Sequence, residues 1–240
     1  MLQYSEFFSN LSHRVESARQ LERELDRQLA RRFNIFDYLS TDELGLSRVL
    51  ADLLNPDAFH GQGGYFLERF LALLSESMGV PRKLDMARSH VYVEVEKLIP
   101  ELRRIDVFVQ LGEGNDAYAL AIENKPFAGD QANQLHDYLK YLDERFHHNY
   151  TLLYLSPNGE GPSECSVRLE ELRENWSDRF GILAYCTTSV FLREDQYAPF
   201  RISNFTLINW LQTCQRECEV DRLRWFVGDL AKYCQREFGD

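Results

Sequence analysis

Two carboxylates and a lysine stand out between residues 104 and 125, because they interrupt segments that are otherwise apolar. Asp106 falls within the segment IDVFVQL, and Glu123 and Lys125 end the segment YALAIENK. Side chains alternate between the two faces of a strand, so Glu123 and Lys125 share one face. Carboxylate oxygens suit Mg²⁺ or Mn²⁺, which would lower the pKa of a bound water and neutralise charge on a reacting phosphodiester. The lysine could orient that water, help to deprotonate it or stabilise the developing charge.

The simpler alternative is a surface ion pair between Lys125 and one of the two carboxylates. A Glu-x-Lys sequence occurs by chance in most proteins of this size, so it is weak evidence alone. Two features strengthen the functional interpretation. Asp106 lies in the preceding predicted strand, and a predicted helix follows directly. That helix carries Gln134 and Tyr138 four residues apart, which places them on one face.

Three further positions could carry chemistry. Glu43 lies near the start of a predicted helix, where a carboxylate can cap the helix, complement its dipole or act as a ligand in a cleft. His60, in the turn AFHGQGG, could touch substrate or bond to the backbone. The turn lacks the Lys-Ser/Thr ending of a phosphate-binding loop. Cys214 and Cys218 have no CxxC partner or nearby histidine to complete a zinc site, which favours buried apolar roles.

A long helix is predicted over residues 5–33, because apolar residues recur there at three- and four-residue steps. This stripe could pack on the rest of the chain or on a second copy of the same helix; it consists of Leu11, Val15, Ala18, Leu21, Leu25 and Leu29. Another face carries arginines at four-residue steps: Arg19, Arg23, Arg27 and Arg31. They could form a track for phosphates or a solvated face paired with neighbouring acidic residues.

The remaining pattern predicts an α/β protein with a mixed central sheet flanked by helices. The strand at 118–125, the helix at 130–146 and the apolar strand at 151–156 indicate a parallel crossover. The other predicted strands are 91–99, 105–111 and 182–186. Further helices are predicted after Ser40, around Phe66, over 167–178 and, as a pair, within 204–238. There is no internal repeat and no low-complexity linker, which favours one domain.

Composition limits the class of protein. Hydrophobic residues make up 44%, enough for a large core, and no apolar run is long enough to span a membrane. The N-terminus does not resemble a secretory signal, and five scattered cysteines favour reduced thiols in the cytoplasm. The formal charge of -11, from 27 basic and 38 acidic residues, counts against electrostatic binding of nucleic acid without excluding it.

Asp106, a turn and then Glu123-Asn124-Lys125 at the end of an apolar strand resemble the signature of the PD-(D/E)XK nuclease superfamily. Gln134-x-x-x-Tyr138 resembles the additional motif of its RecB-like branch. The segments TDELGLSRVLADLLNP, HGQGGYFLERFL, RIDVFV, AIENKP, QANQLHDY and LLYLSPNG follow the order of a subgroup found in bacterial genomes. The resemblance covers roughly residues 33 to 190. It departs at Ile105, which replaces the proline of the family name.

The resemblance implies a restriction-endonuclease-like core within a single domain over 1–240, with 1–32 as a helical N-terminal extension and 200–240 as a C-terminal helical part. It implies that Asp106 and Glu123 bind Mg²⁺ (or Mn²⁺) and that Lys125 is the catalytic lysine. Glu43 would close the site or reach the metal through water.

The resemblance also implies substrate-binding roles. Gln134 and Tyr138 would position the phosphate or support the lysine, and His60 matches the subgroup pattern at a substrate-binding position. The implied function is a metal-dependent nuclease that hydrolyses phosphodiester bonds, with DNA as the expected partner and phage defence or DNA repair as expected roles. The alternative is an inactive nuclease-like module that binds nucleic acid or a protein. A homodimer through the N-terminal helix is a further expectation, and a membrane partner is not expected.

Overall fold

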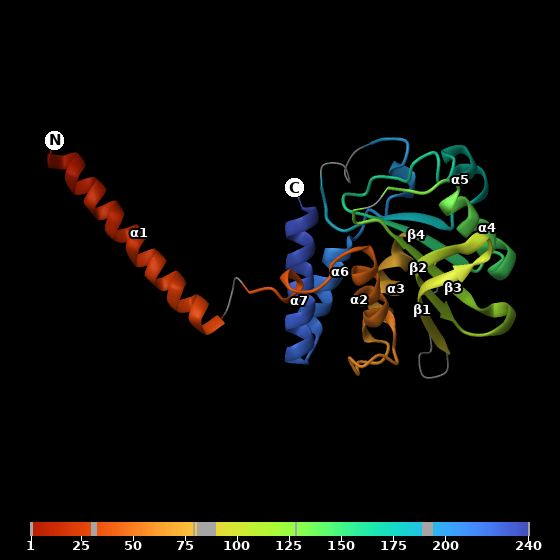
Figure 1. Ribbon diagram of the computed structural model, residues 1–240, viewed down its shortest axis with the longest axis horizontal. Coiled ribbons are helices and arrows are strands. Elements are labelled where there is room, and N and C mark those ends of the chain that lie inside the picture. Colours follow the sequence, from red (N-terminus) through yellow and green to blue (C-terminus); the bar gives the residue numbers. More distant parts are fainter. Residues whose placement is uncertain are drawn as a thin grey trace.

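The computed structural model has a five-stranded sheet with helices on both faces, and one long helix that stands apart from them (Figure 1). It describes residues 2–29, 33–78, 80, 90–127, 129–188 and 194–239. The mixed sheet and its flanking helices confirm the predicted fold class. No helix within the described ranges combines the length and the apolar character that a membrane crossing demands.

The strands follow their order in the sequence across the sheet. They are β1 (Val91–Ile99), β2 (Arg103–Leu111), β3 (Tyr118–Asn124), β4 (Tyr150–Ser156) and β5 (Phe180–Ala184). β1, β2 and β3 are antiparallel, whereas β3, β4 and β5 are parallel. The β3–α4–β4 connection is therefore the predicted parallel crossover. The last strand begins at Phe180, two residues before its predicted start.

Helices cover the two faces of the sheet unequally. One face carries α2 (Glu43–Leu54), α3 (Tyr65–Ser77), α6 (Leu207–Glu217) and α7 (Asp221–Phe238). The other face carries α4 (Gln134–Phe146) and α5 (Leu169–Asn175). The short 3-10 helices are η1 (Ile35–Asp37), η2 (Pro100–Leu102), η3 (Gly114–Asp116) and η4 (Ala198–Phe200). Side-chain alternation in β3 divides the core, since Leu120 and Ile122 face the first group and Ala119 and Ala121 face the second.

The crossover helix α4 begins at Gln134, four residues later than the pattern predicts. Residues before it are used in tertiary contacts instead. The Asp130 carboxylate accepts hydrogen bonds from the hydroxyl of Tyr154 and the backbone N–H of Ser163. Asn133 adopts a left-handed conformation, with φ of 57°. The late start places Gln134 at the first position of the helix.

The long helix α1 spans Leu2–Leu29 and lies away from the sheet and its helices (Figure 1). Its described apolar side chains are open to solvent: Phe8, Leu11 and Val15 are 60%, 46% and 42% exposed. The stripe thus remains uncovered by the part of this chain that the structure describes. Residues 30–32 and the side chains of the Arg23 and Arg27 positions lie outside the described part, so the track for phosphates stays a prediction.

Helix α2 has a defined beginning, which sets the position of Glu43. The Asp42 carboxylate accepts a hydrogen bond of 2.8 Å from the backbone N–H of Gly45, as in a standard N-cap. Gly45 is required here by a close approach, because a Cβ at this position would collide with the carbonyl oxygen of Ser40. Glu43 is therefore held in the first turn of the helix.

Replacing Asp42 with alanine should lower the free energy of unfolding by about 1 kcal/mol, because the Gly45 N–H loses its acceptor. Asp42→Asn is the matched control, since asparagine caps a helix as well as aspartate does. Urea denaturation measures both. Equal losses in the two variants would show that the cap contributes through its charge alone.

Candidate metal centre

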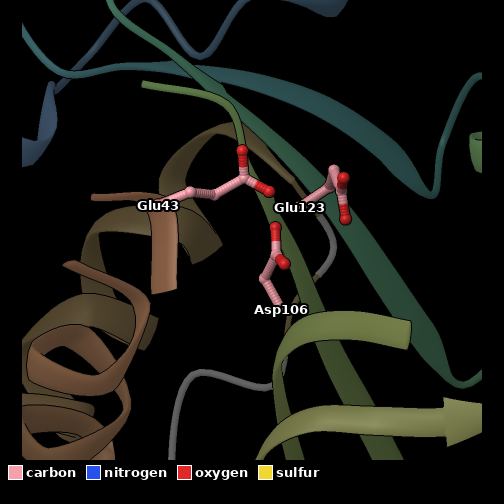
Figure 2. Close-up of side chains that lie close together, drawn as sticks. All are labelled: Glu43, Asp106 and Glu123. Carbon is pink, nitrogen blue, oxygen red and sulfur yellow. The ribbon is translucent and has the colours of Figure 1, made fainter. Parts of the chain in front are cut away.

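Three carboxylates from distant parts of the sequence converge at one end of the sheet (Figure 2). Glu43 comes from the first turn of α2, Asp106 from β2 and Glu123 from the end of β3. One oxygen from each lies within 4.8 Å of the others. Pairing of β2 with β3 brings Asp106 beside Glu123, and the beginning of α2 brings Glu43 over both. The structure thus brings together the three residues that the sequence singled out as metal ligands.

Glu123 is the most deeply buried of the three, with no exposed surface. Its Oε1 lies 2.5 Å from Lys125 Nζ and accepts a 2.6 Å hydrogen bond from Gln134 Nε2. Its Oε2 is buried and has no hydrogen-bond partner among the described residues. A buried carboxylate oxygen without a partner is costly, and a cation placed beside it would remove that cost. This oxygen and the all-carboxylate ligand set fit a hard divalent ion such as Mg²⁺.

The environment makes ionisation of the carboxyl groups unfavourable. Burial raises the pKa of Glu123 well above its ordinary value, and the nearby Asp106 charge raises it further. Burial also raises the pKa of Asp106 to about 6, against the opposing effect of a 2.7 Å hydrogen bond from the Asn124 backbone N–H. Two close carboxylates repel each other in a site with little water. A bound divalent ion would allow both to ionise.

Lys125 closes the cluster. Its Nζ lies 3.3 Å from Glu43 Oε1 as well as 2.5 Å from Glu123 Oε1, and its side chain is 5% exposed. Burial favours the neutral amine, but the surrounding carboxylates, Glu123 foremost, outweigh burial and raise the pKa of Lys125. The lysine is therefore an ammonium ion in this site. The burial of the pair rules out the surface ion pair that the sequence left open.

Gln134 and Tyr138 lie on one face of α4, which packs against the end of β3 that carries Glu123. Gln134 Nε2 donates to Glu123 Oε1 and, over 3.1 Å, to the Tyr138 hydroxyl. That hydroxyl donates in turn to the backbone carbonyl of Arg104 in β2. Both side chains are buried, so in this structure they orient the Glu123 carboxylate. The two roles expected from the sequence, positioning of the phosphate and support of the lysine, stay predictions.

A second hydrogen-bonded chain lies on the opposite face of β3. Asn124 Nδ2 donates to Ser47 Oγ over 3.0 Å, and Ser47 Oγ donates to the Glu43 carbonyl over 2.7 Å. Asn124 Oδ1 accepts a 2.6 Å hydrogen bond from Tyr185. These contacts tie β3 to the turn of α2 that carries Glu43. The sequence showed Asn124 only as the middle residue of the Glu-Asn-Lys triplet, and nothing there marked Ser47 or Tyr185.

His60 does not join the carboxylate cluster. It lies in the loop between α2 and α3, where Nε2 is 3.0 Å from the Asn55 carbonyl and Nδ1 accepts from the Gln62 N–H over 3.0 Å. The ring edge also packs against Phe66. Both nitrogens are thus engaged with the backbone, as in the structural alternative, and a substrate-binding role for His60 stays a prediction.

The raised pKa of Asp106 predicts how stability depends on pH. In metal-free buffer the folded protein keeps a proton on Asp106 that the unfolded chain releases above its ordinary pKa of 3.8. The free energy of unfolding should therefore fall as the pH rises from about 4 to about 6. Asp106→Asn should flatten this dependence and, above pH 6, exceed the stability of the wild type by on the order of 2 kcal/mol.

Urea denaturation at a series of pH values, with a chelator present, measures this effect. Mg²⁺ added at pH 7.5 should stabilise the wild type and leave Asp106→Asn unchanged. An undiminished pH dependence in the variant would contradict the assignment of the titration to this carboxyl.

Comparison with known protein families identifies the family of the chain. The family model described as the PD-(D/E)XK nuclease superfamily matches residues 33–234, which include every residue of the cluster and leave out α1. No curated protein and no solved structure matches the chain. The family match covers the sheet, the convergent carboxylates and the flanking helices up to residue 234 in α7, and on this basis the chain belongs to the PD-(D/E)XK nuclease superfamily.

Proposed function

We propose that the protein is a Mg²⁺-dependent (or Mn²⁺-dependent) nuclease that hydrolyses phosphodiester bonds in DNA. The observation that carries this proposal is the unpartnered Oε2 of the buried Glu123, which lies beside Asp106 and Glu43 and next to the Lys125 ammonium ion. Each of these groups is costly to bury alone. Together they suit a divalent ion and a phosphate better than they suit a purely structural role.

The side chains would divide the work. Asp106, Glu123 and Glu43 would hold the ion, which would activate a water and neutralise charge on the phosphate. Lys125, held as an ammonium ion, would donate to a phosphate oxygen and stabilise the charge that develops there. Its raised pKa makes proton abstraction from water the least favoured of the three roles considered for it. Gln134 and Tyr138 would hold the Glu123 carboxylate in the orientation for binding.

The cellular setting is also a proposal. The Gln134–Tyr138 pair supports a place in the RecB-like branch, for which phage defence or DNA repair in bacteria would be the expected roles. All five cysteines are free thiols, and four are buried, which supports a reducing, cytoplasmic location.

The inactive-module alternative has two observations in its favour. A polyanionic substrate gains little from an acidic protein with a formal charge of -11, and the exposed apolar stripe of α1 could bind a protein partner. The two proposals differ in what Lys125 does. A binding module has no need of a buried ammonium ion among three carboxylates.

Lys125→Ala should reduce cleavage of DNA by about 10²- to 10³-fold, as expected when one group that stabilises transition-state charge is removed. The measurement is a panel of linear, circular and single-stranded DNA and of RNA, with Mg²⁺ or Mn²⁺. Lys140→Ala is the matched control, since Lys140 is an exposed lysine of α4 outside the carboxylate cluster, and this variant should cleave like the wild type. Calorimetry should show divalent binding that Asp106→Asn abolishes. Binding of nucleic acid without cleavage of any form would favour the inactive module.

We further propose that two copies of the chain associate through α1. A free-standing helix with an apolar stripe is marginal in water, so a covering surface would stabilise it. Phe8, Leu11 and Val15 lie on one stripe at steps of three and four residues and are all exposed. A second α1 offers the same spacing, which suits side-by-side packing of two helices.

Replacing both Leu11 and Val15 with glutamate should convert the dimer to a monomer, because the charges would have to be buried in the helix–helix contact. Light scattering coupled to gel filtration measures the mass. Ser17→Glu, on another face of α1, is the control and should remain dimeric. A wild-type protein that is monomeric at every concentration tested would end this proposal.

A further inference from the structure

Phe127 is an exposed aromatic residue that follows Lys125 of the candidate metal centre by two positions. Lys125 and Pro126 are buried, and the chain then emerges so that Phe127 is 60% exposed. Two residues of extended chain span about 7 Å at most, so the Phe127 backbone lies within one nucleotide length of the Lys125 backbone. An exposed apolar ring therefore leaves the chain two residues after Lys125, the lysine proposed to donate to the reacting phosphate.

The Phe127 ring has firm support on one side. It packs on Phe238 at the end of α7, with ring centres 5.5 Å apart and an angle of 46° between the rings. Phe238 packs in turn on Tyr185, at 4.4 Å, and the Tyr185 hydroxyl donates to Asn124. The support therefore leads back to Asn124, which lies between Glu123 and Lys125 in the sequence. A ring held on one side and open on the other can accept a second flat group.

The acidic charge of the protein restricts what such a group can be. The formal charge of -11 counts against attraction of duplex phosphates to the protein as a whole. Stacking of bases on aromatic rings adds affinity by an apolar contact that tolerates any base. Bases expose their faces for stacking only where they are unpaired.

We infer that Phe127 stacks on an unpaired base next to the scissile phosphate and thereby directs the nuclease to single-stranded DNA. This inference rests on the proposed function and adds the substrate class to it. The plain alternative is that Phe127 only shields Phe238 from water. Shielding needs an apolar side chain of any shape, whereas stacking needs an aromatic face, so the two explanations respond differently to substitution.

Phe127→Ala should raise KM for a single-stranded oligonucleotide by about tenfold, with kcat little changed and with cleavage of a blunt duplex unaffected. Phe127→Trp should match or better the wild type, and Phe127→Leu should behave like the alanine variant. Trp225→Ala is the matched control: Trp225 is an exposed aromatic residue on α7, about 20 Å along the helix from Phe238. It should leave KM unchanged. Thermal unfolding of each variant checks that the fold is intact.

A series of oligonucleotides, each with one abasic nucleotide, identifies the stacked base. Loss of the base that stacks on Phe127 should weaken binding to the wild type and have no further effect on Phe127→Ala, since both changes remove the same contact. Equal losses in the wild type and Phe127→Ala at every position would overturn the inference. So would wild-type behaviour of Phe127→Leu on single strands.

Binding is also measured by fluorescence anisotropy in metal-free buffer, which separates this inference from the proposed function. Cleavage of no substrate, together with single-strand binding that depends on Phe127, would refute the nuclease and leave the stacking contact standing. Cleavage that does not change when Phe127 is replaced would support the nuclease and refute the stacking contact. A wild-type protein that binds no single-stranded oligonucleotide would overturn the stacking contact outright.

Discussion

The contact between the Lys125 ammonium ion and the buried Glu123 carboxylate, 2.5 Å apart, is the interaction on which the rest of the site depends. Neither charge is stable in the interior by itself, and each makes the other tolerable. Their neighbours follow from this pair. Gln134 supplies a donor to Glu123, Glu43 supplies a second anion to Lys125, and one carboxylate oxygen is left without a partner. That remaining deficit is what a divalent ion would satisfy.

The alternation of side chains in β3 lets one short strand serve two purposes. Glu123 faces α4, where Gln134 and Tyr138 orient its carboxylate. Asn124 faces the other way, where its hydrogen bond to Ser47 holds the beginning of α2 against the sheet. The metal centre is therefore positioned from both faces of the sheet at once. A shift of β3 by one residue would exchange the two sets and destroy both.

The periphery differs in character from the centre. The side chains of the core and of the carboxylate cluster are mostly buried, whereas α1 and Phe127 present apolar surface to water. Such exposure has a free-energy cost that contacts with another molecule would remove. The two surfaces suit different occupants, since α1 offers a long helical stripe and Phe127 a single supported ring. The acidic charge makes both kinds of apolar contact more valuable than they would be in a basic nuclease.

By itself the sequence determined the strands, the crossover and the identity of the central residues, because these depend on local periodicity and on short motifs. It placed Asp106, Glu123 and Lys125 on neighbouring strands, and the alternation of β3 was sufficient to put two of them on one face. Through the family resemblance it also assigned Glu43, 80 residues before Glu123 in the chain, to the site. Only the tertiary structure showed how close the three carboxylates lie, that Tyr185 and Ser47 hydrogen-bond to Asn124, and that His60 bonds to the backbone. It also decided the late start of α4, since the Asp130 carboxylate accepts hydrogen bonds from Tyr154 and Ser163. The physical reason is the same throughout: period and propensity act over a few residues, whereas burial and hydrogen bonding act between segments that only the folded chain brings together.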